Sequence, residues 1–523
     1  MRAFFISAKN IFTFTREDKI VFFLAISLRL AVFGILLLFS GINDFPFPVI
    51  GSDSRLHIRA MQGLLDYHRF IDPLTSTPLS FILPGYPFFL ALVTSLIGTI
   101  WAVPFIQTAF AGISAVLLFR IGAFLHPIAG WGAALLFIAD PAGLYYTNVI
   151  LTESLFLAFA IIAWYILISF PHHCLKKSLF AGVAIGIAIL VRPAGVILIP
   201  GAIAFLLFAH WPSARRILCA CFLLMAGVSL FLGPWIVRNY IVFREWDISP
   251  VASLQYYAAH APLFYAWREG ISEKEAILLF QRRLEAISPY GDEATTPNAP
   301  YMRRVAFEYI GQYPIEFAAF YAVKTIPLFF SDGIRELAER LNLAPSVMPN
   351  ISNLLLVGDV SPLKNMAIST PLFSLAFFFG LFSWALIIFF AVMGAWKGIR
   401  IKHTHRPLLI SCIVILLVGA MVAGGATSHP RYRHSMSPFI FLLSSFGFLV
   451  AREKITGTHS FPQSSASEPK KRREADRPQE PYAPLSLQTA LELSTGLLCL
   501  SKNSLHYSSR HSWYSKHREE PRL

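Results

Sequence analysis

Charged residues are scarce in this chain of 523 residues. Asp, Glu, Lys and Arg make up 14% of the sequence and apolar residues 55%, whereas an ordinary soluble domain is roughly 25% charged. The apolar residues, which include 47 Phe, fall into long blocks that no single water-soluble core of this length would need. This composition does not fit a soluble globular enzyme, and we expect a membrane protein.

Paired cysteines and Gly-rich phosphate loops are also lacking. The five cysteines lie in or beside apolar blocks or in the C-terminal tail, without metal-like spacing, so no disulfide framework is expected. The sequence has no Rossmann fingerprint and no Gly-rich phosphate loop. This absence is consistent with a protein that binds no nucleotide, but it does not discriminate between functions. The first apolar run lacks a small-residue cleavage site, and we interpret it as a retained helix rather than a signal peptide.

Ten apolar runs are candidates to cross the roughly 30 Å of bilayer hydrocarbon. The net charge of +14 comes from short basic clusters between these runs, which indicates cytoplasmic loops and lipid head groups rather than nucleic acid. The paired basic residues at 176–177 and 215–216 share the cytoplasmic side only if two short helices, divided at Arg192, cross between them. Both termini then face the cytoplasm. The predicted spans are 19–41, 101–123, 127–147, 150–170, 178–191, 193–211, 214–236, 370–396, 406–427 and 434–451.

The segments between these spans define the expected organisation of an all-α polytopic membrane protein. The run 84–98 is too short for a comfortable crossing and is expected along the outer interface, within a first outer loop at 42–100. A large outer loop at 239–369 contains helix-like stretches, at 272–288 and 301–312, and is expected to form an extracytoplasmic domain.

The C-terminal segment differs from the rest of the chain. Residues 1–451 are expected to form the transmembrane module. Residues 452–523 are rich in Ser, Pro, Lys, Arg and Glu and cannot bury enough apolar surface to fold. We expect a disordered basic cytoplasmic tail.

Four arginines lie at the predicted outer ends of spans, in the contexts VRPAG, PWIVRNY and SHPRYRHSMSP: Arg192, Arg238, Arg431 and Arg433. A guanidinium is always charged and donates hydrogen bonds in a planar fork that matches phosphate oxygens. Such a ring predicts a binding site for a lipid phosphate at the outer leaflet. The simpler alternative for each arginine is snorkelling to the interface.

Two carboxylates lie on the same predicted side, Asp53 in GSDSRLHIRA and Glu153 in NVILTESLF. A carboxylate that faces a phosphate-binding basic ring can take a proton from a hydroxyl or amine acceptor, while the arginines stabilise the leaving phosphate. The alternatives are structural: Asp53 at the N-cap of an amphipathic interfacial helix, and Glu153 at a helix N-terminus.

Three further residues are secondary candidates for substrate contact. His57 follows Asp53 by four residues, hence on the same helical face, but a plain interfacial histidine is the simpler interpretation. Lys324, in FYAVKTIPLFF, suits either a buried ion pair or a snorkelling side chain. Tyr86 follows Pro84 at the start of a short helix and is a possible ligand contact.

Taken in order, these motifs resemble the GT-C glycosyltransferases, specifically the bacterial branch related to protein O-mannosyltransferases and to the aminoarabinose transferase of lipid A. The resemblance runs from about residue 20 to 451 and rests on Asp53, PGYPFFLALVTSLIG, Glu153, AGVAIGIAILVRP, PWIVRNY and the RYR near the last span.

The resemblance implies a GT-C fold and a hexosyl or pentosyl transferase. Such an enzyme takes a sugar from a polyprenyl-phosphate donor on the outer face of the plasma (inner) membrane and passes it to a lipid, glycan or protein acceptor. It further implies Asp53 as the base, Glu153 as a second active-site acid or metal ligand, and Arg238 and Arg431 as carrier-phosphate contacts, with Arg192 and Arg433 matching less closely.

The first-loop motif departs from the family in one respect. The family often has Asp-Glu followed three positions later by Tyr, where this chain has Ser54 and His57. Without the second carboxylate, a requirement for a divalent metal at Asp53 and Glu153 is left open.

Two other functions were weighed. A transporter or flippase of lipid-linked sugars usually places charges near the bilayer middle, whereas here the charges cluster on the outer side, with Arg29 within the first span as an exception. An O-antigen polymerase or ligase also uses outer arginines and a large outer loop, but the acidic first loop argues against it.

Overall fold

The described chain is helical, as predicted. In the computed structural model the described residues contain no strand, and one isolated bridge joins Ile71 and Pro78. This confirms the all-α class. The prediction of a disordered tail at 452–523 is wrong for residues 452–456, which form the end of α22, and the remainder of the tail lies outside the described residues. The structure describes residues 13–40, 50–51, 53–169, 175–291, 295–330, 333–341, 343–345, 361–401, 405–425 and 430–456.

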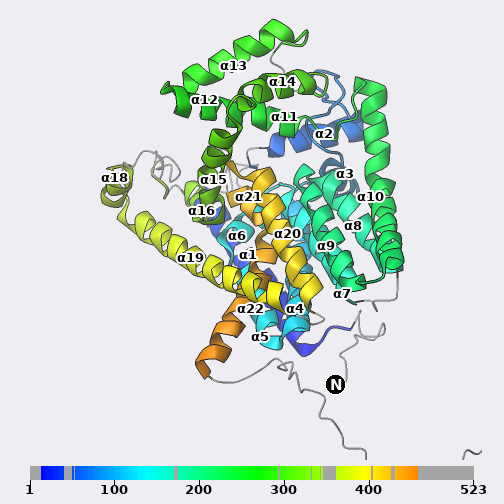
Figure 1. The fold of residues 1–523 in the computed structure, drawn as a ribbon, viewed down its shortest axis with the longest axis vertical. Coiled ribbons are helices and arrows are strands. Elements are labelled where there is room, and N and C mark those ends of the chain that lie inside the picture. The colour runs from blue at the N-terminus through cyan, green and yellow to red at the C-terminus, as the bar shows by residue number, and fades with distance from the viewer. Residues whose placement is uncertain are drawn as a thin grey trace, which may run out of the picture. The chain divides into compact units, whose positions relative to one another are not determined.

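The described helices are labelled in chain order in Figure 1. The first half contains α1 (Arg16–Ser40), α2 (Ser54–Tyr67), α3 (Gly85–Ile97), α4 (Ala102–Leu125), α5 (Pro127–Ala139), α6 (Pro141–Asn148), α7 (Glu153–Ser169), α8 (Lys176–Val191), the 3-10 turn η2 (Pro193–Ile197), α9 (Leu198–His210) and α10 (Ala214–Phe243). The second half contains α11 (Val251–Gln255), the π-helical turn η3 (Tyr256–His260), α12 (Ala261–Glu269), α13 (Glu273–Ile287), α14 (Ala299–Ile310), α15 (Pro314–Phe330), α16 (Ile334–Arg340), α18 (Ser361–Ser369), α19 (Pro371–Arg400), α20 (Arg406–Ala423), α21 (Pro430–His434) and α22 (Ser437–Thr456).

Helices lie at all ten predicted spans, but 127–147 is divided into α5 and α6 and 193–211 into η2 and α9. Not all of these helices are long and apolar enough to cross a membrane by themselves. Six meet that condition among the described residues, in α1, α4, η2 with α9, α10, α19 and α20. A seventh is formed if α5 and α6, which meet at a 55° bend, count as one span. The predicted spans 150–170 and 178–191 correspond to α7 and α8, of 17 and 16 residues, and 434–451 corresponds to α22. The chain is therefore a multi-pass membrane protein with fewer self-sufficient spans than predicted.

The short α8 is stabilised by close contact with α10. Gly182 in α8 and Gly227 in α10 face each other so closely that a Cβ on Gly227 would lie 2.3 Å from the carbonyl oxygen of Leu179. Small residues at such crossings let helix backbones approach within the membrane, where the hydrophobic effect does not drive helices together. Packing of this kind holds Arg192, which directly follows α8, against the bundle.

The segment 239–369, predicted as the large outer loop, contains a group of helices with its own apolar core. Its helices α11 to α14 lie together in Figure 1 and share buried side chains that include Phe264, Phe280 and Met302. A capping box at Ser272 starts α13, since the Ser272 hydroxyl accepts from the Glu275 amide and the Glu275 carboxylate accepts from the Ser272 amide. Both helices predicted in this loop are confirmed, as α13 and α14.

We expect Gly227→Ala to lower the free energy of unfolding by about 1–3 kcal/mol, because the added methyl group would force α8 and α10 apart. Gly233→Ala on the same helix is the matched control: a Cβ there meets nothing within 4 Å, and Ala is the better helix former. The midpoints of thermal unfolding of the purified variants in detergent measure both effects. Equal midpoints for the two variants would contradict the close helix contact.

Candidate functional site

Asp53 is placed by a short network at the start of α2. The amide of Gly51 donates to the Ser54 hydroxyl at 2.7 Å, and that hydroxyl donates to the carbonyl oxygen of Ile150 at 2.7 Å. The start of α2 is thereby fixed to the segment that leads into α7. Asp53 occupies the N-cap position of α2, but its side chain makes no capping hydrogen bond. The carboxylate of Asp53 is therefore directed elsewhere.

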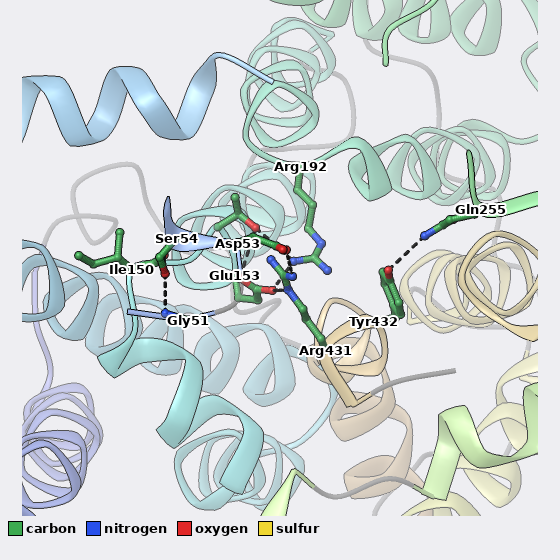
Figure 2. A network of polar contacts seen from close by, with 10 residues as sticks. Gly51, Asp53, Ser54, Ile150, Glu153, Arg192, Gln255, Arg431 and Tyr432 are labelled. Carbon is green, nitrogen blue, oxygen red and sulfur yellow. Dashed lines mark hydrogen bonds and ion pairs between the residues drawn. The ribbon is translucent and has the colours of Figure 1, made fainter. Parts of the chain in front are cut away.

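The carboxylates of Asp53 and Glu153 share one arginine (Figure 2). Arg431, on α21, donates through Nη1 to Oδ2 of Asp53 and through Nε to Oε1 of Glu153. Arg192 donates to the same Glu153 oxygen and, at 3.1 Å, to the hydroxyl of Thr152. Four of the predicted site residues, from the first outer loop, the start of α7, the end of α8 and α21, thus form one cluster.

The two carboxylates differ sharply in exposure. The side chain of Glu153 is 0% exposed, whereas that of Asp53 is 42% exposed. A fully buried carboxylate is tolerated only when it is paired, and removal of one partner typically costs 3–5 kcal/mol. Glu153 is therefore suited to anchoring the two guanidinium groups, and Asp53 is the carboxylate within reach of a substrate.

The charges in the cluster shift the pKa values of neighbouring groups. Burial alone would lower the pKa of Arg431, but the carboxylates of Glu153 and Asp53 raise it well above its ordinary value. Burial and the positive charge of Arg431 lower the pKa of His57 to about 4, although the two carboxylates act in the opposite direction. Arg431 is therefore a fixed positive charge, and His57 is neutral near pH 7.

The other two predicted arginines make different contacts. Arg238 donates to the carbonyl oxygen of Leu79 at 2.8 Å and to Asn239 Oδ1 at 2.9 Å, and its guanidinium lies 4.9 Å from the Trp235 ring centroid. Arg238 therefore connects α10 to the segment between α2 and α3. Arg433 is fully buried. It donates to Asp140 at 3.1 Å, at the bend between α5 and α6.

The secondary candidates lie beside the cluster or away from it. Tyr86 is fully buried, and its hydroxyl donates to Gln107 Oε1 at 2.7 Å. The ring of His57 packs edge-on against Tyr86, and its Nδ1 has no hydrogen-bond partner among the described residues. Lys324 is buried in α15, 5.6 Å from the centroid of the Phe320 ring. Tyr86 and His57 therefore pack against each other in the interior, close enough to the cluster for the charges of Asp53 and Arg431 to act on His57.

Several residues of the site were missed in the sequence. Asp140 accepts from both Arg433 and His434, the latter at 2.9 Å, and so anchors the segment that carries Arg431. An acidic residue followed by Pro in the middle of an apolar run was a detectable signal of a broken helix there. Gln107 donates to the carbonyl oxygens of Thr147 and Val149, at 2.9 and 2.8 Å.

Two further missed residues come from the large outer loop. Arg340, on α16, donates to the carbonyl oxygen of Ile50, three residues before Asp53. Gln255, the last residue of α11, donates to the hydroxyl of Tyr432 at 3.1 Å. Nothing local in the sequence distinguishes either residue from other polar residues of the loop.

The cluster does not have the composition of a metal site. Within the described ranges, no group of three or more His, Cys, Asp or Glu side chains is arranged to hold a metal ion. The position between Asp53 and Glu153 that a cation would take is filled by the guanidinium of Arg431. The side chains present therefore do not fit a divalent metal in this arrangement.

Comparison with known proteins gives one family match. Residues 77–237 match the family model described as dolichyl-phosphate-mannose-protein mannosyltransferase. This stretch includes Tyr86, Glu153 and Arg192, and it ends directly before Arg238. A search of curated proteins finds no match.

Among solved structures, the chain is similar to an Archaeoglobus fulgidus oligosaccharyltransferase crystallised with a tethered acceptor peptide that contains an NVT sequon. The two are 12% identical, with a TM-score of 0.42. The match covers 83% of this chain and 50% of that chain, so this chain spans about half the length of the solved structure.

The sequence match includes the half of the cluster formed by Glu153 and Arg192, and the structure adds Asp53 and Arg431 to it. Over residues 77–237 the chain is thus similar to a family of membrane-bound mannosyltransferases, which agrees with the resemblance of its motifs.

Proposed function

We propose that the chain transfers a sugar from a polyprenyl-phosphate donor to a hydroxyl or amine of an envelope acceptor, with inversion at the anomeric carbon. The observation that carries this proposal is the shared arginine: Arg431 joins the exposed carboxylate of Asp53 to the buried carboxylate of Glu153. A proton acceptor and a phosphate-binding cation are thus adjacent. These are the two groups that the reaction needs.

Asp53 is the proposed base. The acceptor oxygen or nitrogen attacks the anomeric carbon, the bond from that carbon to the phosphate oxygen breaks, and the proton of the acceptor passes to Asp53. The leaving polyprenyl phosphate keeps the electron pair. Glu153 is too deeply buried to meet an acceptor, and we assign it to positioning the guanidinium groups.

Arg431 and Arg192 are the proposed phosphate ligands. A donor phosphate competes with the carboxylates for Arg431, and the contact with exposed Asp53 is the easier one to exchange because Glu153 is also held by Arg192. Binding of the donor thereby frees Asp53 to accept a proton. The same guanidinium groups then stabilise the charge that develops on the leaving phosphate.

We further propose that the cluster faces the outside of the plasma membrane. Helix α8 begins at Lys176 and ends beside Arg192, and α22 begins just after α21 and ends with Arg452 and Lys454. In both helices the basic residues lie at the end away from the cluster. Basic residues favour the cytoplasmic side, so the end beside the cluster is expected on the opposite side. A donor anchored in the outer leaflet reaches such a site from the side.

We expect Asp53→Asn to reduce sugar transfer by about a hundredfold to ten-thousandfold, since the amide cannot accept the proton. The assay uses membranes with a polyprenyl-phosphate sugar donor. Asp66→Asn, an exposed change on the same helix α2, should leave transfer unchanged. Full activity of Asp53→Asn at normal expression would remove Asp53 from the mechanism.

Arg431→Lys keeps the charge but loses the fork that reaches two oxygens at once. We expect the KM for the donor to rise about tenfold to a hundredfold, as for the loss of one hydrogen bond to a charged group, and kcat to fall as well. Arg304→Gln, which removes an exposed arginine of the outer domain, serves as the control. A KM that does not change would show that the phosphate binds elsewhere.

His57 is predicted to take no part in proton transfer. Its pKa of about 4 lies below the ordinary 6.5, so the folded protein holds the neutral form, and protonation costs stability only as the pH falls from 6.5 toward 4. In His57→Gln, the dependence of the transfer rate on pH between about pH 6 and 8 should have the same shape as in the wild type, even if the rate itself differs. Loss of an inflection in that range would assign the titration to His57.

A further inference from the structure

Tyr432 lies beside the charged cluster, between the two arginines of the RYR motif (Figure 2). The centroid of its ring is 5.7 Å from the guanidinium carbon of Arg192, and its hydroxyl accepts from Gln255 Nε2 at 3.1 Å. Both side chains are partly exposed. The pair is therefore a partly exposed polar group next to the proposed phosphate ligand Arg192.

The residues on both sides of Tyr432 are firmly held. Arg431 is bound to Asp53 and Glu153, and Arg433 and His434 are bound to the buried Asp140. Tyr432 is thus fixed in place although its own side chain contacts neither carboxylate. Gln255 is the residue before the π-helical turn η3, and such turns occur frequently at functional sites.

The hydrogen-bonding capacity of this pair matches that of a sugar ring. A phenol that accepts from an amide nitrogen retains its own O–H as a donor, and the amide oxygen of Gln255 remains an acceptor. Neither group is charged. Neighbouring hydroxyls of a pyranose or furanose, each both donor and acceptor, are complementary to a donor and an acceptor held side by side.

Resting on the proposed function, we propose that Gln255 and Tyr432 form the sugar-recognition wall of the donor site and select an uncharged, polyhydroxylated sugar. The sugar of the donor is bonded directly to the phosphate, so its ring has to lie next to the groups that bind that phosphate. Tyr432 follows Arg431 in the chain and its ring lies 5.7 Å from the guanidinium carbon of Arg192, so the Tyr432–Gln255 pair is an uncharged polar group beside both proposed phosphate ligands.

The test compares binding of the donor with binding of its bare carrier. In membranes, the KM is measured for polyprenyl-phosphate donors that carry a hexose, an N-acetylhexosamine or a pentose, together with the inhibition constant of polyprenyl phosphate itself. Gln255→Ala and Tyr432→Phe are expected to raise the KM of the preferred donor about tenfold, as for one lost hydrogen bond. The inhibition constant of the bare carrier should stay unchanged.

Two matched changes on the outer domain serve as controls, Gln312→Ala and Tyr290→Phe, both at exposed positions. They should change neither constant. The double variant Gln255→Ala with Tyr432→Phe should raise the KM by less than the product of the single effects, because the two side chains interact.

The outcomes separate the two proposals. If the wild-type chain transfers sugar but the variants keep its KM values and donor preference, the recognition wall is refuted and the proposed function stands. If the variants weaken the bare carrier as much as the donor, the pair only supports the arginines, and the recognition wall is again refuted. If the wild-type chain transfers sugar from none of these donors, the proposed function fails and this inference fails with it.

Discussion

A single buried carboxylate sets the requirements for the whole site. Glu153 has no exposure to solvent, and an unpaired charge there would be strongly destabilising. The fold meets this requirement with Arg192 from the end of α8 and Arg431 from α21. Because Arg431 is held by Glu153, it is also in position to meet Asp53. The chemistry of the exposed carboxylate thus depends on the electrostatics of the buried one.

A second buried ion pair supports the first. Asp140 lies where α5 and α6 meet at 55°, and it binds Arg433 and His434. The interrupted helix therefore provides an anchor for the short helix α21, which carries Arg431. Arg29 of α1 also lies at this bend, where it donates to the carbonyl oxygen of Phe137 and to the hydroxyl of Thr147. Arg29 therefore has hydrogen-bond partners inside the bundle. A structural role accounts for this arginine within a span, and a transport role is not needed to explain it.

Helix positions and the residue types at helix ends could be predicted from the sequence, because both depend on the composition and charge of short segments. Apolar length and basic clusters predicted helices at all ten positions, the division at Arg192, and the two outer helices α13 and α14. The cluster of Asp53, Glu153, Arg192 and Arg431 was predicted from its residue types at the ends of spans. The same reasoning did not separate Arg238 and Arg433 from these residues, because the direction of a side chain depends on tertiary contacts. For Arg238 those contacts are the carbonyl oxygen of Leu79 and the Trp235 ring, and for Arg433 they are Asp140 and Trp384.

The partners of Glu153 are separated very unequally along the chain, by 39 residues for Arg192 and by 278 for Arg431. During synthesis, at about 5–20 residues per second, the guanidinium of Arg192 is made seconds after Glu153, whereas that of Arg431 is made only after the helices between α8 and α21. The early pair compensates the charge while the bundle is incomplete. The groups proposed for catalysis meet only once α21 has been made, so a chain that stops before α21 does not carry the assembled cluster.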